Sequence, residues 1–186
     1  MILCVLGSAS KDSVTRRAVE LVMERFVQHG STPELVDLST EFTQLHDIEQ
    51  YADPEPGSQT ALLRDRVASA SAVVLASPVY HGTFSGLLKN ALDHLEGDSL
   101  AAKPVGILAA GGGPRSAAVA CDHLRTVTRA LSGWAVPTHV AVTSTDFEPG
   151  DDFDNLVERA DELVTELLSF RAGPAAAPSE EPRHDH

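Results

Sequence analysis

Cysteine is scarce in this sequence, because Cys4 and Cys121 are the only two among 186 residues. Two cysteines cannot build a disulfide framework or a cysteine-based zinc site, so other interactions must hold the fold. Long apolar runs are also missing, since runs such as 73–76 are far too short to cross a bilayer. The first residues are apolar but carry no basic leader and no cleavage signal. We therefore expect a soluble, cytoplasmic protein with no membrane partner.

Basic residues are in the minority as well. The chain has 14 Lys and Arg against 27 Asp and Glu, a formal net charge of −13. This is the wrong sign for a general nucleic-acid binder, so no nucleic-acid partner is expected. The acids are unevenly spread: 146–170 holds nine acids and one base, whereas 1–145 holds 15 acids and 11 bases. An anionic ligand is therefore compatible with the first 145 residues, and the acidic segment is expected to be the solvated face of a helix.

Strand-like and helix-like segments alternate along the chain. The apolar runs predict five strands, and helical spacing predicts five helices between or after them. A polar stretch at 39–58 is expected to be a long loop, and a Pro- and Ala-rich end at 171–186 a disordered tail after one domain at 1–170. The alternation predicts an α/β fold with a doubly wound parallel sheet and helices on both faces. The predicted strands are 2–6, 35–38, 72–76, 105–109 and 139–142, and the helices are about 13–28, 60–70, 85–95, 116–131 and 153–168.

Three loops follow predicted strands at what should be one edge of the sheet. In doubly wound sheets, ligands bind outside the carboxyl ends of the strands, near the point where strand order reverses. The loops at 7–13, 78–84 and 110–115 all begin at such ends. Their convergence is the main indication of a binding site.

The first loop has the composition of an anion site. Hydroxyl side chains surround the start of the following helix, whose first backbone N–H groups lack helical partners. Lys11, Arg16 and Arg17 add positive charge nearby. The alternative is that Ser13 is an ordinary N-cap and the arginines are solvated. Neither a nucleoside-triphosphate P-loop nor a dinucleotide G-x-G-x-x-G is present.

The second and third loops suit a flat ligand. Tyr80 and Phe84 offer aromatic faces, and glycine lets the backbone approach a ring closely. The run Gly111-Gly112-Gly113-Pro114-Arg115 combines that freedom with a cation. The alternatives are core or interface packing for the aromatic residues, a solvated position for His81 and an ordinary turn for the glycines.

Other enzyme classes lack their motifs here. The nucleophile elbow G-x-S-x-G is absent, and neither cysteine has a basic residue six positions later, as a phosphatase loop needs. Cys4 lies within a predicted buried strand and should be inert. The histidines at 29, 46, 94, 123 and 139 lack metal-ligand spacing and are interpreted as surface or helix-end residues, so no metal site is predicted. His184 and His186 belong to the predicted tail.

One segment is specific enough to identify a family. Residues 77–93 read Ser-Pro-Val-Tyr-His-Gly-Thr-Phe-Ser-Gly-Leu-Leu-Lys-Asn-Ala-Leu-Asp. Together with Gly7-Ser8 and Ser13, this resembles the NADPH-dependent FMN reductase family over about residues 1–170. The resemblance implies a flavodoxin-like three-layer α/β/α sandwich with a five-stranded parallel sheet. It also implies a homodimer or homotetramer, with helix 85–95 and the helix after Pro114 at the interface.

The resemblance further implies the cofactors and their contacts. FMN and NADPH or NADH would meet so that a hydride passes from nicotinamide to flavin. No proton-transfer side chain is needed for that step, and none is predicted as catalytic. The expected phosphate ligands are Ser8, Ser10, Ser13 and Thr15, with Val14 in the same segment; the ring would contact Pro78, Val79, Tyr80, His81, Gly82 and Thr83; Gly111, Gly112 and Gly113 would approach its pyrimidine edge, and Arg115 the nicotinamide phosphates.

Two departures bear on function. The family's phosphate loop usually reads Gly-Ser-x-Arg-x-x-Ser, but Ser10 stands at the arginine position, so either Lys11 or Arg16 could supply that contact. Val79 resembles the alkanesulfonate-utilisation branch, whose members supply reduced flavin to a flavin-dependent monooxygenase. The helix after the third loop lacks that branch's one-residue insertion with a tyrosine, which suggests a prosthetic FMN. The first hypothesis is an FMN reductase with a monooxygenase partner; the alternatives are a flavoprotein reducing quinones, azo compounds or metal oxyanions, and a flavodoxin-like electron carrier.

Overall fold

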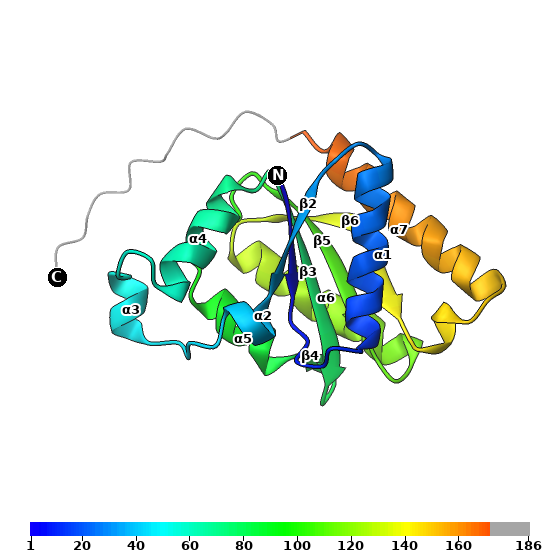
Figure 1. The fold of residues 1–186 in the computed structure, drawn as a ribbon, viewed down its shortest axis with the longest axis horizontal. Helices are drawn as coiled ribbons and strands as arrows, with labels where there is room; N and C mark the ends of the chain where they lie inside the picture. Colours follow the sequence, from blue (N-terminus) through cyan, green and yellow to red (C-terminus); the bar gives the residue numbers. More distant parts are fainter. Residues whose placement is uncertain (172–186) are drawn as a thin grey trace.

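The structure is a computed structural model that describes residues 1–171. Most of the predicted tail, from 172 onward, therefore lies outside the described residues. The elements follow one another in the expected alternation (Figure 1). They are β1 (Ile2–Leu6), α1 (Val14–Gln28), β2 (Pro33–Asp37), α2 (Leu38–Glu41), α3 (Ile48–Ala52), α4 (Gln59–Ser69), β3 (Ala72–Tyr80), β4 (Thr83–Phe84), α5 (Gly86–Asp93), β5 (Pro104–Ala110), α6 (Pro114–Ala130), β6 (Trp134–Val142), the 3-10 turn η1 (Thr145–Phe147) and α7 (Asp151–Ser169).

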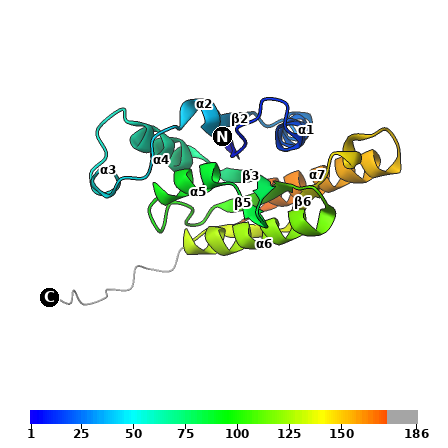
Figure 2. The ribbon, with the colours of Figure 1, turned by 90° about the horizontal axis from the view of Figure 1, so that it is seen from below.

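The sheet confirms the predicted doubly wound topology. Five parallel strands have the order β2-β1-β3-β5-β6, and the short β4 pairs antiparallel with β3. The order reverses between β1 and β3, as in flavodoxin-like sheets, so the loops after these two strands flank the switch point. Figure 2 shows the molecule from the carboxyl ends of the strands, with α1 and α7 on one side of the sheet and α4 and α5 on the other.

Two apolar clusters hold the helices to the sheet. One contains Phe26 of α1 and Leu163 of α7, packed on the face formed by residues such as Cys4. The other contains Leu88 of α5 and Leu124 of α6, packed on the opposite face. Strands buried on both faces are continuous apolar runs, which is why the pattern of β1, β3 and β5 was readable. Within residues 1–171, no helix is both long and apolar enough to span a membrane.

The predicted loop at 39–58 is wrong in part, because it contains two short helices. Asp37 caps α2 by accepting from the N–H of Ser39, and Asp47 caps α3 by accepting from the N–H of Glu49. Helices of four and five residues are too short to show an apolar period, so only these capping acids could have revealed them. The capping also moves Leu38, which was predicted as strand, into α2.

Two strands are longer than predicted. β3 continues to Tyr80, so most of the expected second loop is strand. β6 begins at Trp134 instead of 139, and its pairing with β5 shifts register: Val105 faces Ala135, whereas Ile107 faces His139. The extra residues form a bulge, which hides the regular alternation on which the prediction depended.

The bulge lies on an edge strand whose backbone is held by side chains. Glu166 of α7 accepts from the backbone N–H of Thr138 at 2.8 Å and from its hydroxyl at 2.9 Å. Arg125 of α6 donates to the carbonyl oxygens of Val136 at 2.7 Å and Pro137 at 2.6 Å. Neighbouring helices thus satisfy backbone groups of β6 that an edge strand leaves unpaired.

Candidate functional site

The three predicted loops do converge on one edge of the sheet. Leu6 of β1 pairs in register with Ala76 of β3, and Pro78 of β3 pairs with Ala110 of β5. Because these strands are parallel, the chain leaves all three at the same side, which is the edge facing the viewer in Figure 2. The segments at 7–13, 78–84 and 110–115 are therefore neighbours in space.

The first loop is anchored to the start of α5. The N–H of Gly7 donates to the carbonyl oxygen of Ala76 at 2.8 Å, and its own carbonyl accepts from the hydroxyl of Ser85 at 2.6 Å. A Cβ at Gly7 would lie 2.6 Å from the Cβ of Leu88, so only glycine fits here. Ser85 is also the N-cap of α5, with its Oγ accepting from the N–H of Leu88. The first two loops are thereby fixed to each other.

Ser13 caps α1, as the alternative interpretation expected. Its Oγ accepts from the N–H of Arg16 at 3.1 Å. Ser10 and Lys11 lie in the loop before it and are exposed. The remaining N–H groups of the first turn of α1 still need partners, as at any helix start.

Two hydroxyls of this segment are buried without a partner. Ser8 and Thr15 are each 1% exposed, and neither Ser8 Oγ nor Thr15 Oγ1 has a hydrogen-bond partner within residues 1–171. A buried hydroxyl without a partner costs free energy, so such a group in a native fold calls for an explanation. An anion bound at the N-terminus of α1 would explain both. The residues present therefore fit a phosphate group.

The two arginines of α1 are already engaged. Arg16 forms an ion pair with Asp37, the last residue of β2. Burial alone would raise the pKa of Asp37, but hydrogen bonds from Ser39 and Arg16 and the charge of Arg16 together lower it below its usual value. The guanidinium of Arg17 lies 4.1 Å from the centre of the Phe147 ring. Sequence reasoning missed Asp37, although an acid at the carboxyl end of a strand was visible.

The second loop is a tight hairpin at the end of β3. Val79 pairs with Phe84 and Tyr80 with Thr83, which leaves His81 and Gly82 as the turn. Their φ angles are 51° and 81°, as a type I′ turn requires at both central positions. The hairpin presents Tyr80 with 51% of its surface exposed.

Contacts from two neighbouring elements hold this hairpin. Nδ1 of His123, on α6, lies 2.9 Å from the hydroxyl of Thr83. The buried Ser77 donates to the carbonyl oxygen of Pro78 and accepts from the N–H of Ser85, both at 2.8 Å. Sequence reasoning placed His123 at the surface without a role and gave Ser77 none, because neither contact follows from local spacing.

The third loop combines one packed glycine with two open ones. A Cβ at Gly111 would lie 2.7 Å from Oγ of Ser116 and 3.2 Å from Cγ2 of Val79, whereas Gly112 and Gly113 face open space. Gly113 is the N-cap of α6 and, having no side chain, leaves the helix start without a side-chain acceptor. Backbone N–H groups are therefore available beside the hairpin. Arg115 is exposed in the first turn.

The Lys-Asn pair of the signature has structural contacts. Asn90 donates to the carbonyl oxygen of Gln44 and accepts from the N–H of His46. Lys89 pairs with Asp93 one turn later at 2.6 Å. Asn90 thus joins α5 to the segment after β2, and Lys89 pairs within α5. None of these contacts involves a residue of the three loops.

Buried titratable groups lie away from the three loops. Burial raises the pKa of both Cys4 and Cys121 to about 12, which fits the expected inert thiol. His94, predicted at the surface, is instead fully buried, with Nδ1 2.8 Å from the hydroxyl of Thr60. Among residues 1–171, no three His, Cys, Asp or Glu side chains gather as metal ligands do.

One hollow of the described residues lies away from the three loops. It measures about 750 Å³ and runs along α7, lined by acids such as Asp154, Glu158 and Glu162. An acidic hollow repels the phosphates of both expected cofactors. It is therefore a poor candidate for their site.

The structure thus brings the predicted residues together, although their contacts with a ligand remain predictions. Ser8 and Thr15 are buried, Ser13 is a cap and Ser10 is exposed. The residues gathered at this edge are Ser8, Ser10, Ser13, Val14, Thr15, Pro78, Val79, Tyr80, His81, Gly82, Thr83, Gly111, Gly112, Gly113 and Arg115.

Comparisons with known proteins identify the family of this chain. The family described as NADPH-dependent FMN reductase matches residues 1–147. An FMN-dependent NADPH-azoreductase from Staphylococcus saprophyticus is 37% identical over 176 residues, which cover 90% of this chain and 93% of that protein. One of the same description from Staphylococcus aureus is 35% identical over the same shares.

Solved structures show the same fold. An oxidoreductase from Corynebacterium diphtheriae has a TM-score of 0.71 at 22% identity, covering 91% of this chain and 98% of its own. The NAD(P)H:(acceptor) oxidoreductase FerB from Paracoccus denitrificans also has a TM-score of 0.71, at 19% identity, covering 90% and 96%. With the family match over most of the chain, these likenesses establish that this protein is an oxidoreductase of the NADPH-dependent FMN reductase family, with a flavodoxin-like fold and with FMN and NAD(P)H as its cofactors.

Proposed function

We propose that this protein keeps FMN bound and passes electrons from NADPH or NADH to a small acceptor of the azo or quinone class. The observation that carries the proposal is the pair of buried, unpartnered hydroxyls, Ser8 in the first loop and Thr15 in the first turn of α1. They suit a phosphate that stays in place. The azoreductase description of relatives at 37% and 35% identity supports the choice of acceptor.

The residues of the first loop would bind the phosphate. The N–H groups of the first turn of α1 and the hydroxyls of Ser8 and Thr15 are donors, and a helix N-terminus favours negative charge. The ring would lie against the hairpin, whose turn at His81 and Gly82 is fixed by its pairing. When bound, FMN supplies the hydride acceptor of the reaction.

The third loop would act on the far side of the ring. Gly112 and Gly113 have no side chains to obstruct a close approach, and N–H groups at the start of α6 can stabilise negative charge there. The chain's share of catalysis is then to hold two rings face to face and to exclude water. We assign no proton-transfer side chain to the hydride step.

An absorption spectrum of the gently purified protein tests the proposal. We expect a yellow protein that bleaches when NADPH is added without oxygen and recovers its colour on addition of an azo dye or a quinone. A colourless protein that oxidises NADPH only with added FMN contradicts prosthetic FMN. A coloured protein that neither NADPH nor NADH bleaches contradicts the enzyme and favours an electron carrier.

A second candidate function is the supply of reduced FMN to a flavin-dependent monooxygenase. Val79, at the position where the signature allows Glu or Val, supports it through its resemblance to the alkanesulfonate-utilisation branch. The colourless outcome of the same experiment would favour this function. A coupled assay with such a monooxygenase would then be the next measurement.

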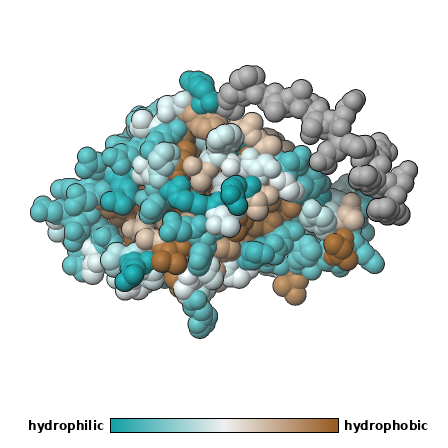
Figure 3. Space-filling model, turned by 180° about the vertical axis from the view of Figure 1, so that it is seen from behind, coloured by the Kyte–Doolittle hydropathy of each residue, from teal (hydrophilic) through white to brown (hydrophobic). Residues whose placement is uncertain are grey.

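We also propose that α5 and α6 form an interface between copies of the chain. Val119 of α6 is 40% exposed, and Tyr80 of the hairpin adds exposed apolar area. Figure 3 shows hydrophobic atoms on the rear of the molecule among many hydrophilic ones. Gel filtration at micromolar concentration should give a dimer or tetramer, and a monomer would refute the interface.

The folding unit is proposed to be 1–170. A chain ending at Phe170 should therefore bind FMN as the full chain does, which equilibrium dialysis would check. Loss of binding on this truncation would show that the last residues belong to the functional unit.

A further inference from the structure

The first loop and the first turn of α1 together hold three buried polar atoms that lack partners within residues 1–171. Besides Ser8 Oγ and Thr15 Oγ1, Nε of Arg16 has no hydrogen-bond acceptor within residues 1–171. A guanidinium is always charged and carries five N–H donors in a fixed plane. Arg16 follows Thr15 in the first turn of α1, where its N–H donates to the capping Ser13. An unpaired donor of a charged group in this turn calls for an acceptor, and an anion at the helix start would supply one.

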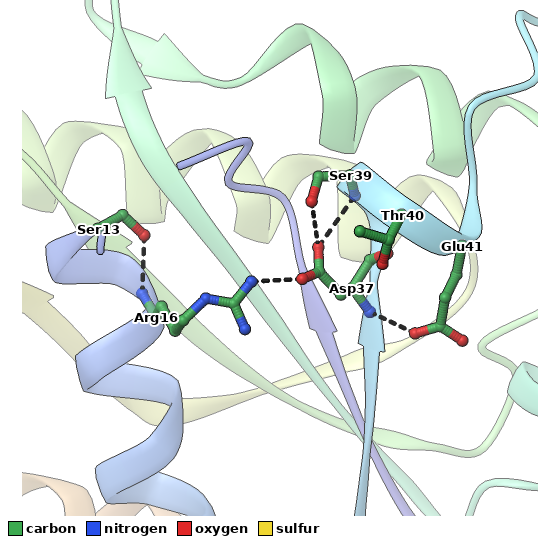
Figure 4. Close-up of polar contacts among 6 residues, drawn as sticks. All are labelled: Ser13, Arg16, Asp37, Ser39, Thr40 and Glu41. Atoms are coloured by element: carbon green, nitrogen blue, oxygen red, sulfur yellow. Dashed lines mark hydrogen bonds and ion pairs between the residues drawn. The ribbon is translucent and has the colours of Figure 1, made fainter. Parts of the chain in front are cut away.

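Arg16 is held in place by its ion pair. Figure 4 shows its side chain reaching from α1 to Asp37, and one terminal nitrogen, NH2, is paired with Oδ2. The other carboxylate oxygen, Oδ1, accepts from the N–H of Ser39 at 3.0 Å and from its hydroxyl at 2.7 Å. With both oxygens of Asp37 engaged, the carboxylate cannot swing away and the guanidinium keeps one orientation.

The pair stands directly beside the first loop. Asp37 is the register partner of Leu6, the residue before Gly7 and Ser8. Neighbouring strands lie about 4.8 Å apart, so the backbone of Asp37 lies next to the residue that leads into the loop. The side chains of Arg16 and Asp37 are only 19% and 16% exposed, so water screens their charges incompletely.

We propose that Arg16, positioned by Asp37, is the cation of this chain's phosphate site, and that the pair makes the protein prefer FMN to riboflavin. The inference rests on the proposed FMN binding at the first loop. In the family's phosphate loop an arginine occupies the position of Ser10. Under this proposal Arg16 supplies the positive charge that Ser10 lacks. Asp37 has two opposing effects, because it orients Arg16 yet places a second negative charge near the phosphate.

The other nearby cations fit this role less well. Arg17 is exposed, and its guanidinium lies over the Phe147 ring, which follows β6. Lys11 is exposed in the loop, so water competes for its charge. Arg17→Ala is therefore a matched control. It removes the same charge as Arg16→Ala, from the neighbouring residue of the same helix.

Equilibrium dialysis of the full chain against FMN and, separately, against riboflavin tests the inference. The variants are Arg16→Ala, Asp37→Asn, the double variant and Arg17→Ala. We expect Arg16→Ala to weaken FMN binding by roughly tenfold or more, as for loss of a charge-assisted hydrogen bond, and riboflavin binding by less than about twofold. Arg17→Ala should change both by less than about threefold.

The double variant tests the part played by Asp37. Without Arg16, the carboxylate of Asp37 is uncompensated beside the phosphate, so the double variant should bind FMN more tightly than Arg16→Ala alone. Double-variant binding no tighter than that of Arg16→Ala would overturn this part. Thermal unfolding of each variant, measured alongside, identifies any variant that binds poorly because it folds poorly.

The failures of the inference and of the proposed function are distinguishable. If the unaltered chain binds FMN but Arg16→Ala binds it equally well, Arg16 is not the phosphate cation, while FMN binding stands. Equal losses for FMN and riboflavin would show that Arg16 only supports the fold, which also overturns the inference. If the unaltered chain binds neither flavin, the proposed function itself is wrong.

Discussion

The side-chain amide of Asn90, on α5, donates to the carbonyl oxygen of Gln44 at 2.8 Å. This bond joins α5 to the segment that follows β2. The other amide atom of Asn90, Oδ1, accepts from the N–H of His46 at 2.9 Å. Asn90, which belongs to the family signature, thus forms hydrogen bonds with backbone groups 46 and 44 residues away in the sequence. The segment from 43 to 47 has no regular secondary structure, so such bonds are what give it a fixed path.

Replacing Asn90 with alanine should therefore cost stability. Two backbone groups lose their partners, and we expect the free energy of unfolding to fall by about 1–2 kcal/mol. Urea unfolding would measure this. Lys89→Ala is the control on the same helix, because its exposed pair with Asp93 should contribute less than about 0.5 kcal/mol. Equal shifts of the two unfolding midpoints would contradict a structural role for Asn90.

Two alanine substitutions in the third loop should have opposite consequences. A Cβ at Gly111 would meet Ser116, so Gly111→Ala should lower the unfolding temperature. Gly112→Ala adds its methyl group to open space and should leave that temperature unchanged. If this loop approaches the flavin ring, Gly112→Ala should nevertheless weaken FMN binding several-fold. FMN binding as tight as in the unaltered chain would place the ring away from Gly112.

Stability should fall as the pH drops below about 6.5. Burial, followed by the nearby charges of His46 and Arg64, lowers the pKa of His94 below its ordinary value. Below the pKa of an unfolded histidine, about 6.5, the unfolded chain binds a proton that the folded chain resists, so unfolding is favoured. Above that pH this contribution to stability is complete.

Unfolding temperatures between pH 8 and pH 5.5 would measure the effect. In His94→Asn the decline should be shallower, with a remainder from His139, whose pKa burial also lowers. An unchanged slope in His94→Asn would show that His94 titrates normally.

Neither thiol should react while the chain is folded. Burial raises the pKa of Cys4 and Cys121 to about 12, so at pH 8 almost no thiolate is present, and neither sulfur is accessible. A chromogenic disulfide reagent should detect no thiol in the native protein and both after denaturation. Rapid reaction of one thiol in native buffer would show that the structure covering it unfolds locally, and would contradict this prediction.

The parts of this molecule that the sequence revealed are those set by local pattern. Runs such as Val73–Ala76 are buried on both faces and read directly as strands, and the acids of α7 leave an apolar face for the sheet. Ser13 was recognisable as a cap from its position before a helix. The convergence of the three loops then followed from parallel strand direction alone.

What the sequence could not reveal depends on partners distant along the chain. Arg16 pairs with Asp37 across 21 residues, and His94 meets Thr60 across 34. Nothing in the local spacing of His94 distinguishes a buried histidine from a surface one at a helix end. The early start of β6 was hidden for a related reason, because the bulge at Val136 to Thr138 breaks the alternation that marks a strand.

The side chains that hold β6 also limit how this sheet can grow. A strand that paired with β6 across its bulge would compete with Glu166 and Arg125 for the backbone groups that these side chains already hold. Displacing these bonds would expose two charged groups before any new pairing formed. At this stretch of β6, edge-to-edge pairing with a second copy would therefore have to break existing hydrogen bonds before it could form new ones.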